Sequence, residues 1–179
     1  MLTARDLSDG KEPVSYEELD FLKELVATLP PFPVIVNIGA ADGLSTMAFL
    51  EERVDCFIYS IDVDPCPQEL EHVEQGGHDV RKVVRLLGNS QKIGANFPHD
   101  CDMLFVDGDH WGAGKDAEIW ASKVKPGGII AFHDFIVPPN PLNNPGSVYD
   151  DVMAWHRKND EYDEIGWVDR VIAFGVPGG

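Results

Sequence analysis

Helix-forming and strand-forming segments alternate along almost the whole chain, and this alternation restricts the fold more than any other feature of the sequence. Residues 34–38 (VIVNI) form a short, mostly apolar run of the kind that is buried on both faces of a sheet. Further strands are expected at 57–61, 82–87, 103–106 and 129–132. Helical segments separate these strands, so the sequence predicts an α/β domain with a mainly parallel sheet.

The two ends of the chain carry signals of their own. Ser15 and Glu18 form a capping-box pair that predicts a helix over 16–29, and Pro30 ends this helix. Beyond the last central strand, a segment rich in proline and asparagine predicts a long loop. The final elements are expected to be this loop at 136–146, a helix at 147–158 and an antiparallel hairpin at 165–176 that turns near Asp169.

Composition and charge exclude several classes of protein. The 179 residues suit one domain, and 31 acidic against 14 basic residues give a net charge of −17. Lysine and arginine form no cluster that could bind phosphates, so a nucleic-acid substrate is not expected. No apolar run is long enough to span a membrane, and the first residues lack the apolar core of a signal peptide. Three scattered cysteines suit a reducing cytoplasm, which is the expected location.

The loop after the first strand predicts a nucleoside site. Gly39 allows a sharp turn, and Gly43 allows a ligand to approach the backbone closely. Ser45 opens the next helix, whose free N–H groups attract anions. Asp62 ends the second strand, 19 positions after Gly43, where a carboxylate can accept hydrogen bonds from ribose hydroxyls. Tight packing of the loop and a merely polar strand end are the alternatives.

Four segments together resemble a known family. Residues 36–46 (VNIGAADGLST) resemble the first motif of class I S-adenosylmethionine-dependent methyltransferases, and Asp62 falls where that family places its ribose-binding acid. Residues 88–91 (GNSQ) resemble the segment that flanks adenine in the catechol-type O-methyltransferase branch. Residues 104–110 (LFVDGDH) and 125–134 (KPGGIIAFHD) match that branch and its small-molecule relatives, including the methyltransferase family 24-like proteins.

This resemblance covers roughly residues 34–135 and implies both an architecture and an activity. It implies a Rossmann-like, doubly wound sheet of seven strands in the order 3-2-1-4-5-7-6, with the last strand antiparallel. The chain would be one methyltransferase domain, with a helical segment at 1–33, a cofactor-binding core at 34–135, and a substrate loop, helix and hairpin at 136–179. The implied reaction is methylation of a hydroxyl oxygen on a small molecule.

The resemblance also implies S-adenosylmethionine as the cofactor. The residues expected to bind it are Gly39, Ala41, Gly43, Ser45, Asp62, Val63, Gly88, Asn89, Ser90 and Asp107. Asn37 departs from the family, which usually has a carboxylate there that supports the glycine loop. An asparagine can still bond backbone N–H groups, and a lower affinity for the cofactor is one expectation.

Acidic and histidine side chains follow two strands that are neighbours in a doubly wound sheet. Asp107 and His110 follow the fourth strand, and His133 and Asp134 follow the fifth. The resemblance implies a divalent metal held by Asp107, His133 and Asp134. Magnesium suits the carboxylates, whereas the imidazole widens the choice to manganese, iron or zinc. A self-capping turn and a satisfied strand-end histidine are the alternatives. Asp109 is expected to N-cap the following helix.

His110 and Asp107 are the residues expected to be catalytic. His110 lies three positions after Asp107, where the catechol-type enzymes place a basic residue. An imidazole with an ordinary pKa of about 6.5 could remove the proton of the acceptor hydroxyl at neutral pH.

Several other functions stay open from the sequence alone. One is a non-catalytic nucleoside-binding module, and another is a methyltransferase that needs no metal. An NAD-dependent oxidoreductase is disfavoured, because Ala41 and Leu44 stand where a dinucleotide site favours glycine. A metal-dependent hydrolase would leave the cofactor motifs without a use. Neither a membrane nor a nucleic acid is expected as a partner, and the sequence leaves a homo-oligomer open.

Overall fold

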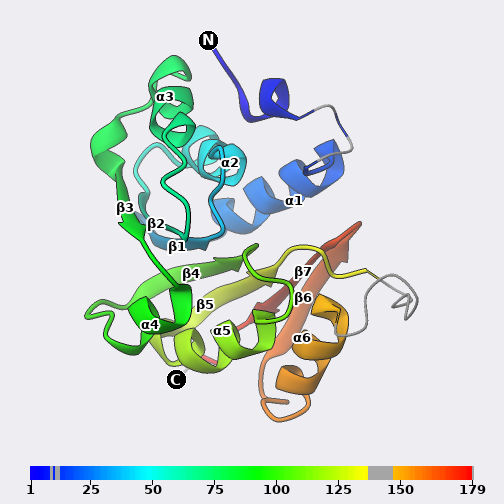
Figure 1. Ribbon diagram of the computed structural model, residues 1–179. Helices are drawn as coiled ribbons and strands as arrows, with labels where there is room; N and C mark the ends of the chain where they lie inside the picture. The colour runs from blue at the N-terminus through cyan, green and yellow to red at the C-terminus, as the bar shows by residue number, and fades with distance from the viewer. Residues whose placement is uncertain (9, 11–12, 137–146, 179) are drawn as a thin grey trace.

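The computed structural model describes residues 1–8, 10, 13–136 and 147–178, and within these ranges seven strands form one sheet (Figure 1). The strand order is β3-β2-β1-β4-β5-β7-β6, which confirms the order that the family resemblance implied. The strands from β1 to β5 are parallel, whereas β7 pairs antiparallel with both β5 and β6. The strands are β1 (Val34–Ile38), β2 (Phe57–Asp62), β3 (Val83–Leu87), β4 (Cys101–Val106), β5 (Val124–Phe132), β6 (Asp163–Val168) and β7 (Val171–Gly175).

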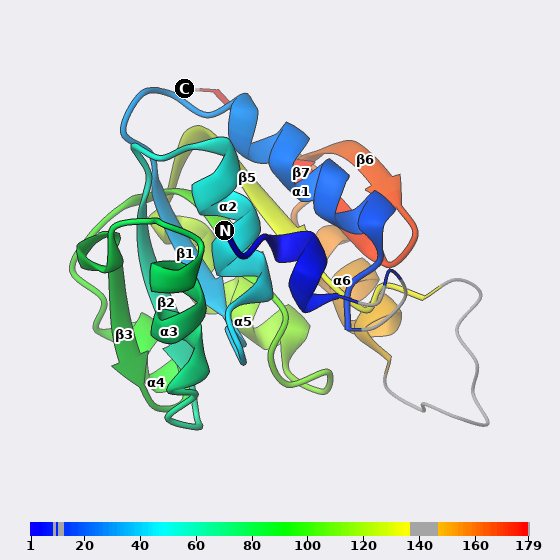
Figure 2. The same cartoon turned by 90° about the horizontal axis from the view of Figure 1, so that it is seen from above.

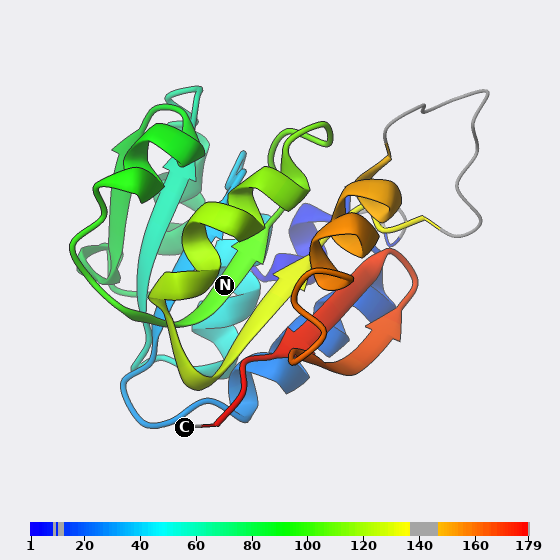
Figure 3. The same cartoon turned by 90° about the horizontal axis from the view of Figure 1, so that it is seen from below.

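Helices cover both faces of the sheet. Figure 2 shows α1, α2 and α3 over one face, and Figure 3 shows α4, α5 and α6 over the other. The helices are α1 (Tyr16–Ala27), α2 (Leu44–Glu52), α3 (Gln68–Gln75), α4 (Ser90–Ala95), α5 (Ala113–Trp120) and α6 (Val148–His156). Short 3-10 turns at η1 (Ala4–Leu7), η2 (Val80–Lys82) and η3 (Ala121–Lys123) also occur.

Each face of the sheet has its own apolar core. On the side of α1 and α2, the buried rings of Phe49 and Phe105 meet edge to face at 5.8 Å. On the other side, Phe132 packs against Trp155 and Phe174 at 5.7 and 6.2 Å. Because both faces are covered, the central strands are apolar almost throughout, as the sequence of β1 predicted.

The start of α1 confirms the predicted capping box. The backbone N–H of Glu18 donates to the Ser15 hydroxyl at 3.3 Å, and the Ser15 N–H donates to the Glu18 carboxylate at 2.6 Å. Glu18 is nevertheless completely buried, which is unusual for a residue of a capping box. Its carboxylate therefore has partners inside the protein, described below.

The fifth strand begins earlier than the sequence predicts. A strand was expected at 129–132, but β5 starts at Val124 and includes residues 125–128 (KPGG). Val124 pairs with Cys101, which likewise lies ahead of the predicted start of β4, and the register then shifts before Met103 meets Ile129. The two extensions stabilise each other across the sheet, so neither is visible in a local pattern. The predicted loop at 136–146 lies outside the described residues from 137 onward.

The carboxyl ends of β1 and β4 meet at a glycine. Gly39 has a φ of 81°, and a Cβ atom at this position would lie 2.0 Å from the carbonyl oxygen of Asp107. The Asp107 N–H donates to the Ile38 carbonyl at 2.9 Å. Only a residue without a side chain allows the first loop to lie directly against the end of β4.

Among the residues that the structure describes, no helix has the length and apolar character needed to cross a bilayer.

Candidate functional site

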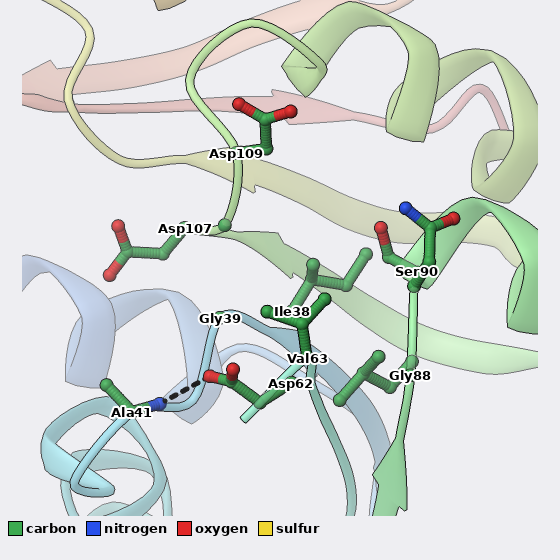
Figure 4. A pocket seen from close by; sticks show the side chains of 12 residues that line it. Ile38, Gly39, Ala41, Asp62, Val63, Gly88, Ser90, Asp107 and Asp109 are labelled. Atoms are coloured by element: carbon green, nitrogen blue, oxygen red, sulfur yellow. Dashed lines mark hydrogen bonds between the residues drawn. The ribbon is translucent and has the colours of Figure 1, made fainter. Parts of the chain in front are cut away.

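A cavity of about 350 Å³ opens at the carboxyl ends of the first four strands (Figure 4). The last residues of β1 and β2 and the segments that follow all four strands contribute to the lining. The lining residues are Ile38, Gly39, Ala41, Ile61, Asp62, Val63, Gly88, Asn89, Ser90, Asp107, Gly108 and Asp109. In an open parallel sheet, this edge is where ligands bind.

Asp62 fixes the shape of the first loop. One of its carboxylate oxygens accepts the Ala41 N–H at 3.0 Å, and the other accepts the Asp64 N–H at 2.9 Å. Ala41 has a φ of 44°, in the left-handed region that non-glycine residues rarely adopt. In Figure 4 the Asp62 carboxylate lies beside Ala41, with Gly88 and Ser90 on the other side of the view. The carboxylate stays half-buried, within reach of a ligand in the cavity.

A second cavity of about 330 Å³ adjoins the first and shares Gly39, Ala41 and Asp107 with it. Residues of the N-terminal segment form one of its walls. Its further lining residues are Leu7, Pro13, Val14, Ala40, Asp42, Leu44, Ser45 and His72. The two cavities therefore meet at the glycine loop and at Asp107.

All residues predicted to bind the cofactor line one of these cavities, except Gly43. Ser45 lines the second cavity, whereas Gly43 lines neither of them. Gly43 instead packs on Glu69, since a Cβ atom there would lie 2.7 Å from the Glu69 Cγ atom. The prediction that Asp109 N-caps the next helix is wrong: Gly112 is the N-cap, and Asp109 accepts the Trp111 N–H at 3.1 Å. Asp109 therefore closes its own turn and faces the first cavity.

The ends of β4 and β5 bring the predicted acidic and histidine residues together. The His133 ring is buried, and its Nδ1 atom lies 3.0 Å from an Asp107 oxygen and 3.5 Å from an Asp134 oxygen. One ligand atom from each of these three residues falls within 4.8 Å of the others. The predicted convergence beside the first cavity is confirmed.

Two further residues, which the sequence analysis did not assign to a functional site, complete this cluster. The Glu18 carboxylate lies 3.4 Å from His133 Nε2. This nitrogen is buried and has no well-formed hydrogen bond. Arg170, in the turn between β6 and β7, donates its backbone N–H to Glu18 at 2.9 Å and its guanidinium Nε at 3.2 Å. The Arg170 guanidinium also lies 3.4 Å from Asp134. Helix α1 and the terminal hairpin are thus joined at the end of β5.

Burial and ion pairing shift the pKa values of this cluster in opposite directions. Burial by itself favours neutral forms, yet the charges of Asp107, Asp134 and Glu18 outweigh it and raise the pKa of His133 to about 12. Against the same burial, His133, the Ser15 N–H and Arg170 lower the pKa of Glu18 to about 2. Burial dominates at Asp107 and raises the pKa of its carboxyl.

His110 reaches the same cluster from the exposed side. Its Nε2 atom lies 2.8 Å from an Asp134 oxygen, and half of its side chain is exposed. A carboxylate that accepts Nε2–H holds the imidazole in one orientation and leaves Nδ1 able to accept a proton. His110 is therefore anchored on one side and accessible on the other.

This sheet order, with a glycine loop after β1 and an acid at the end of β2, is the fold of class I S-adenosylmethionine-dependent methyltransferases. The chain belongs to the methyltransferase-domain family, because the family model described as "Methyltransferase domain" matches residues 36–135, more than half of the chain. No curated protein matches this chain in a sequence search.

Solved structures with the same fold include several methyltransferases. The O-methyltransferase TomG from Streptomyces achromogenes, in complex with SAM, has a TM-score of 0.75 and 16% identity, and the match covers 93% of this chain and 82% of TomG. An O-methyltransferase from Bacillus cereus, in complex with SAH, has a TM-score of 0.72 and 16% identity, with coverage of 96% and 86%. SAH-bound PaMTH1 from Podospora anserina has a TM-score of 0.73 and 16% identity, with coverage of 96% and 83%. At these identities the likeness concerns the fold.

We predict that Glu18→Gln lowers the free energy of unfolding by about 3 kcal/mol at pH 7, because it removes the fully buried anion that pairs with both His133 and Arg170. The pKa of Glu18 falls from its ordinary value of 4.5 to about 2 on folding. Its stabilising effect is therefore complete above pH 4.5 and is lost as the pH falls toward 2. Urea unfolding between pH 3 and pH 7 measures the difference, which should shrink below pH 4.5. Glu17→Gln, at the exposed neighbouring position, is the control, and a loss that stays constant with pH would contradict the assignment.

Proposed function

We propose that this protein transfers the methyl group of S-adenosylmethionine to a hydroxyl oxygen of a small molecule, with help from a divalent metal. The observation that carries the proposal is the position of Asp107, which lines both cavities and also belongs to the charged cluster with His133 and Asp134. A cofactor in the cavities would thus end beside the acids and bases that an acceptor needs. TomG and the Bacillus cereus protein, both O-methyltransferases bound to SAM or SAH, support oxygen as the acceptor atom.

The two cavities suit the two ends of the cofactor. The adenosine would lie in the first cavity, with the ribose hydroxyls on Asp62 and the adenine against Gly88, Asn89 and Ser90. Val63 lines this cavity although 66% of it is exposed, so a bound adenine would cover an apolar surface that now faces water. The amino-acid end would extend into the second cavity toward Ser45, at the start of α2.

We expect calorimetry to detect binding of S-adenosylmethionine and S-adenosylhomocysteine but not of NAD. Asp62→Ala should weaken binding of both sulfur nucleosides roughly 100-fold, because it removes the acceptor of two ribose hydroxyls and the anchor of the Ala41 loop. Asp64→Ala, two positions along and exposed, should bind like the wild type. If neither sulfur nucleoside binds at millimolar concentration, the proposed function is wrong.

His110 is the proposed general base. In the transfer, the acceptor oxygen forms a bond to the methyl carbon as the bond from that carbon to the sulfonium sulfur breaks, and the hydroxyl proton goes to His110 Nδ1. Asp134 positions the ring through its 2.8 Å contact with Nε2 and stabilises the imidazolium that forms. The half-exposed ring is open to an acceptor that enters from solvent.

His110→Ala should lower the rate of methyl transfer at least 100-fold, because it removes the base, while affinity for S-adenosylhomocysteine changes less than threefold. The rate is measured as transfer of labelled methyl from S-adenosylmethionine, first with the wild type on a panel of phenols and polyols to find an acceptor. His99→Ala, on an exposed loop away from the cluster, is the control. An undiminished rate in the His110 variant would remove His110 from the mechanism.

The residues at the ends of β4 and β5 fit a divalent cation. Two carboxylates and one imidazole lie close enough for shared ligation, and this mixed donor set favours manganese, iron or zinc over magnesium. Glu18, behind His133, would hold the other ring nitrogen, as carboxylates commonly do for metal-bound histidines. When bound, such a cation lowers the pKa of a coordinated hydroxyl. The neighbouring carboxylates raise the pKa of His133, so a metal that binds its ring would displace a proton.

Binding of manganese or zinc should therefore strengthen with pH, by about tenfold per unit for one displaced proton. Titration calorimetry at pH 6, 7 and 8 measures the affinity. Asp107→Asn should weaken it at least tenfold, whereas Asp109→Asn, which changes a carboxylate outside the cluster, should leave it unchanged. Absence of binding at millimolar metal would leave the metal-independent methyltransferase as the better description.

A small, uncharged or cationic acceptor fits the electrostatics better than a nucleic acid. The net charge of −17 repels phosphate backbones, and the cluster itself is built around Glu18, Asp107 and Asp134. All three cysteines are free thiols, which supports a reducing compartment, and we propose the cytoplasm.

A further inference from the structure

A chain of buried polar side chains lies beneath the glycine loop and begins at Asn37, in the middle of β1. The Asn37 amide nitrogen donates to the hydroxyls of Ser45 and Thr46, both at 3.0 Å. All three side chains are buried. They join β1 to the first turn of α2, which directly follows the loop.

A fully buried carboxylate meets this chain from the opposite side. Glu69, at the start of α3, accepts the Thr46 hydroxyl at 2.6 Å and the Ser60 hydroxyl at 2.8 Å. The Arg85 Nε atom lies 3.1 Å from Glu69 and pairs with its charge. Gly43 packs directly on the Glu69 side chain. Glu69 thus touches the glycine loop, the start of α2, and strands β2 and β3.

Asn37 and Glu69 are matched through a single proton. The Thr46 hydroxyl has one hydrogen, which it donates to Glu69, so the group on its other side must be a donor. The Asn37 amide provides that donor. An aspartate at position 37 would instead place a second carboxylate against the Thr46 oxygen, with no hydrogen between them.

We infer that Glu69 is a positioning residue for the cofactor, because it contacts Gly43 of the glycine loop and accepts the Thr46 hydroxyl at the start of α2. Ser45 lines the second cavity, and Ser60 lies two residues before Asp62 in β2, so the Glu69 network reaches both ends of the site. The inference rests on the proposed binding of S-adenosylmethionine. In this chain the carboxylate below the loop comes from α3, and β1 contributes the amide donor of Asn37.

The test exchanges the two groups in a double variant that combines Asn37→Asp with Glu69→Gln. The introduced carboxylate in β1 then accepts the Thr46 hydrogen, and the introduced amide in α3 donates to the Thr46 oxygen while its carbonyl still faces Ser60 and Arg85. Each single variant breaks the match. Glu69→Gln leaves Arg85 and Thr46 competing for one carbonyl oxygen, and Asn37→Asp sets two carboxylates on one hydroxyl.

Calorimetric affinity for S-adenosylhomocysteine and the unfolding midpoint are measured for all three variants. Glu71→Gln, exposed on the same helix, is the control. Each single variant should lower affinity about tenfold, and the exchanged pair should return to within about threefold of the wild type. A purely structural role would lower the unfolding midpoint but leave the affinity of the folded protein unchanged.

Two results would overturn the inference. One is wild-type affinity in folded Glu69→Gln, and the other is an exchanged pair as weak as the product of the single losses. If Glu69→Gln does not fold, Asn37→Asp and the exchanged pair carry the comparison.

The two proposals fail in different ways. If the wild type binds no S-adenosylhomocysteine, the proposed function and the cofactor role of Glu69 are both wrong. If the exchanged pair then recovers the unfolding midpoint, the complementary hydrogen bonding of Asn37 and Glu69 contributes to stability only. If the wild type binds and the single variants bind equally well, the inference about Glu69 fails and the proposed function stands.

Discussion

The close approach of two strand ends at Gly39 is the constraint on which the rest of the site depends. No side chain fits between this residue and the Asp107 carbonyl, so the loop after β1 lies on the end of β4. That contact places Asp62, which holds Ala41 in the loop, and Asp107 on one edge of the sheet. Both cavities and the charged cluster are arranged around it. A single backbone contact between neighbouring strands thus sets where a ligand lies and which side chains it meets.

The protein contains two networks of buried polar side chains, one around Glu69 and one around His133, and the two differ in how fully their groups are satisfied. Around Glu69, neutral donors and one arginine satisfy a carboxylate, and the result is a rigid support below the loop. Around His133, three carboxylates compete for the protons and charges of two histidines and Arg170. A fully satisfied network specifies one arrangement, whereas a group with several similar partners can exchange a proton or an ion for another. The proposed support and the proposed chemistry therefore rest on two separate networks that share no residue.

Local patterns predicted the elements whose signals lie in consecutive residues. The apolar run of β1 and the capping box of α1 are both of this kind, and both were found at the predicted positions. The early start of β5 was missed, because residues 125–128 have the composition of a turn and only pairing with Cys101 makes Val124 part of a strand. The family resemblance, rather than periodicity, provided the strand order.

The same limit applies to the site: residues at strand ends could be predicted, whereas residues whose partners are distant in the sequence could not. Asp107, His133 and Asp134 follow strand ends, so their meeting could be foreseen from the order of elements. Glu18 could not, because its local role in the capping box explained it fully and its partner Arg170 lies 152 positions away. Gly43 was predicted to approach the ligand, but the close approach that it permits is to Glu69. Residues with two roles are recognised by sequence only in the role that is local.

The bond between Glu18 and Arg170 also sets an order of events during synthesis. Helix α1 leaves the ribosome before every strand of the sheet, and the turn that carries Arg170 follows six of the seven strands. Until that turn has emerged, the buried carboxylate of Glu18 and the half-buried carboxylate of Asp134 lack their guanidinium. The glycine loop and its Glu69 support are complete long before that. A growing chain therefore contains every residue that lines the first cavity well before Arg170 emerges, whereas the charged cluster is complete only when the sheet is nearly finished.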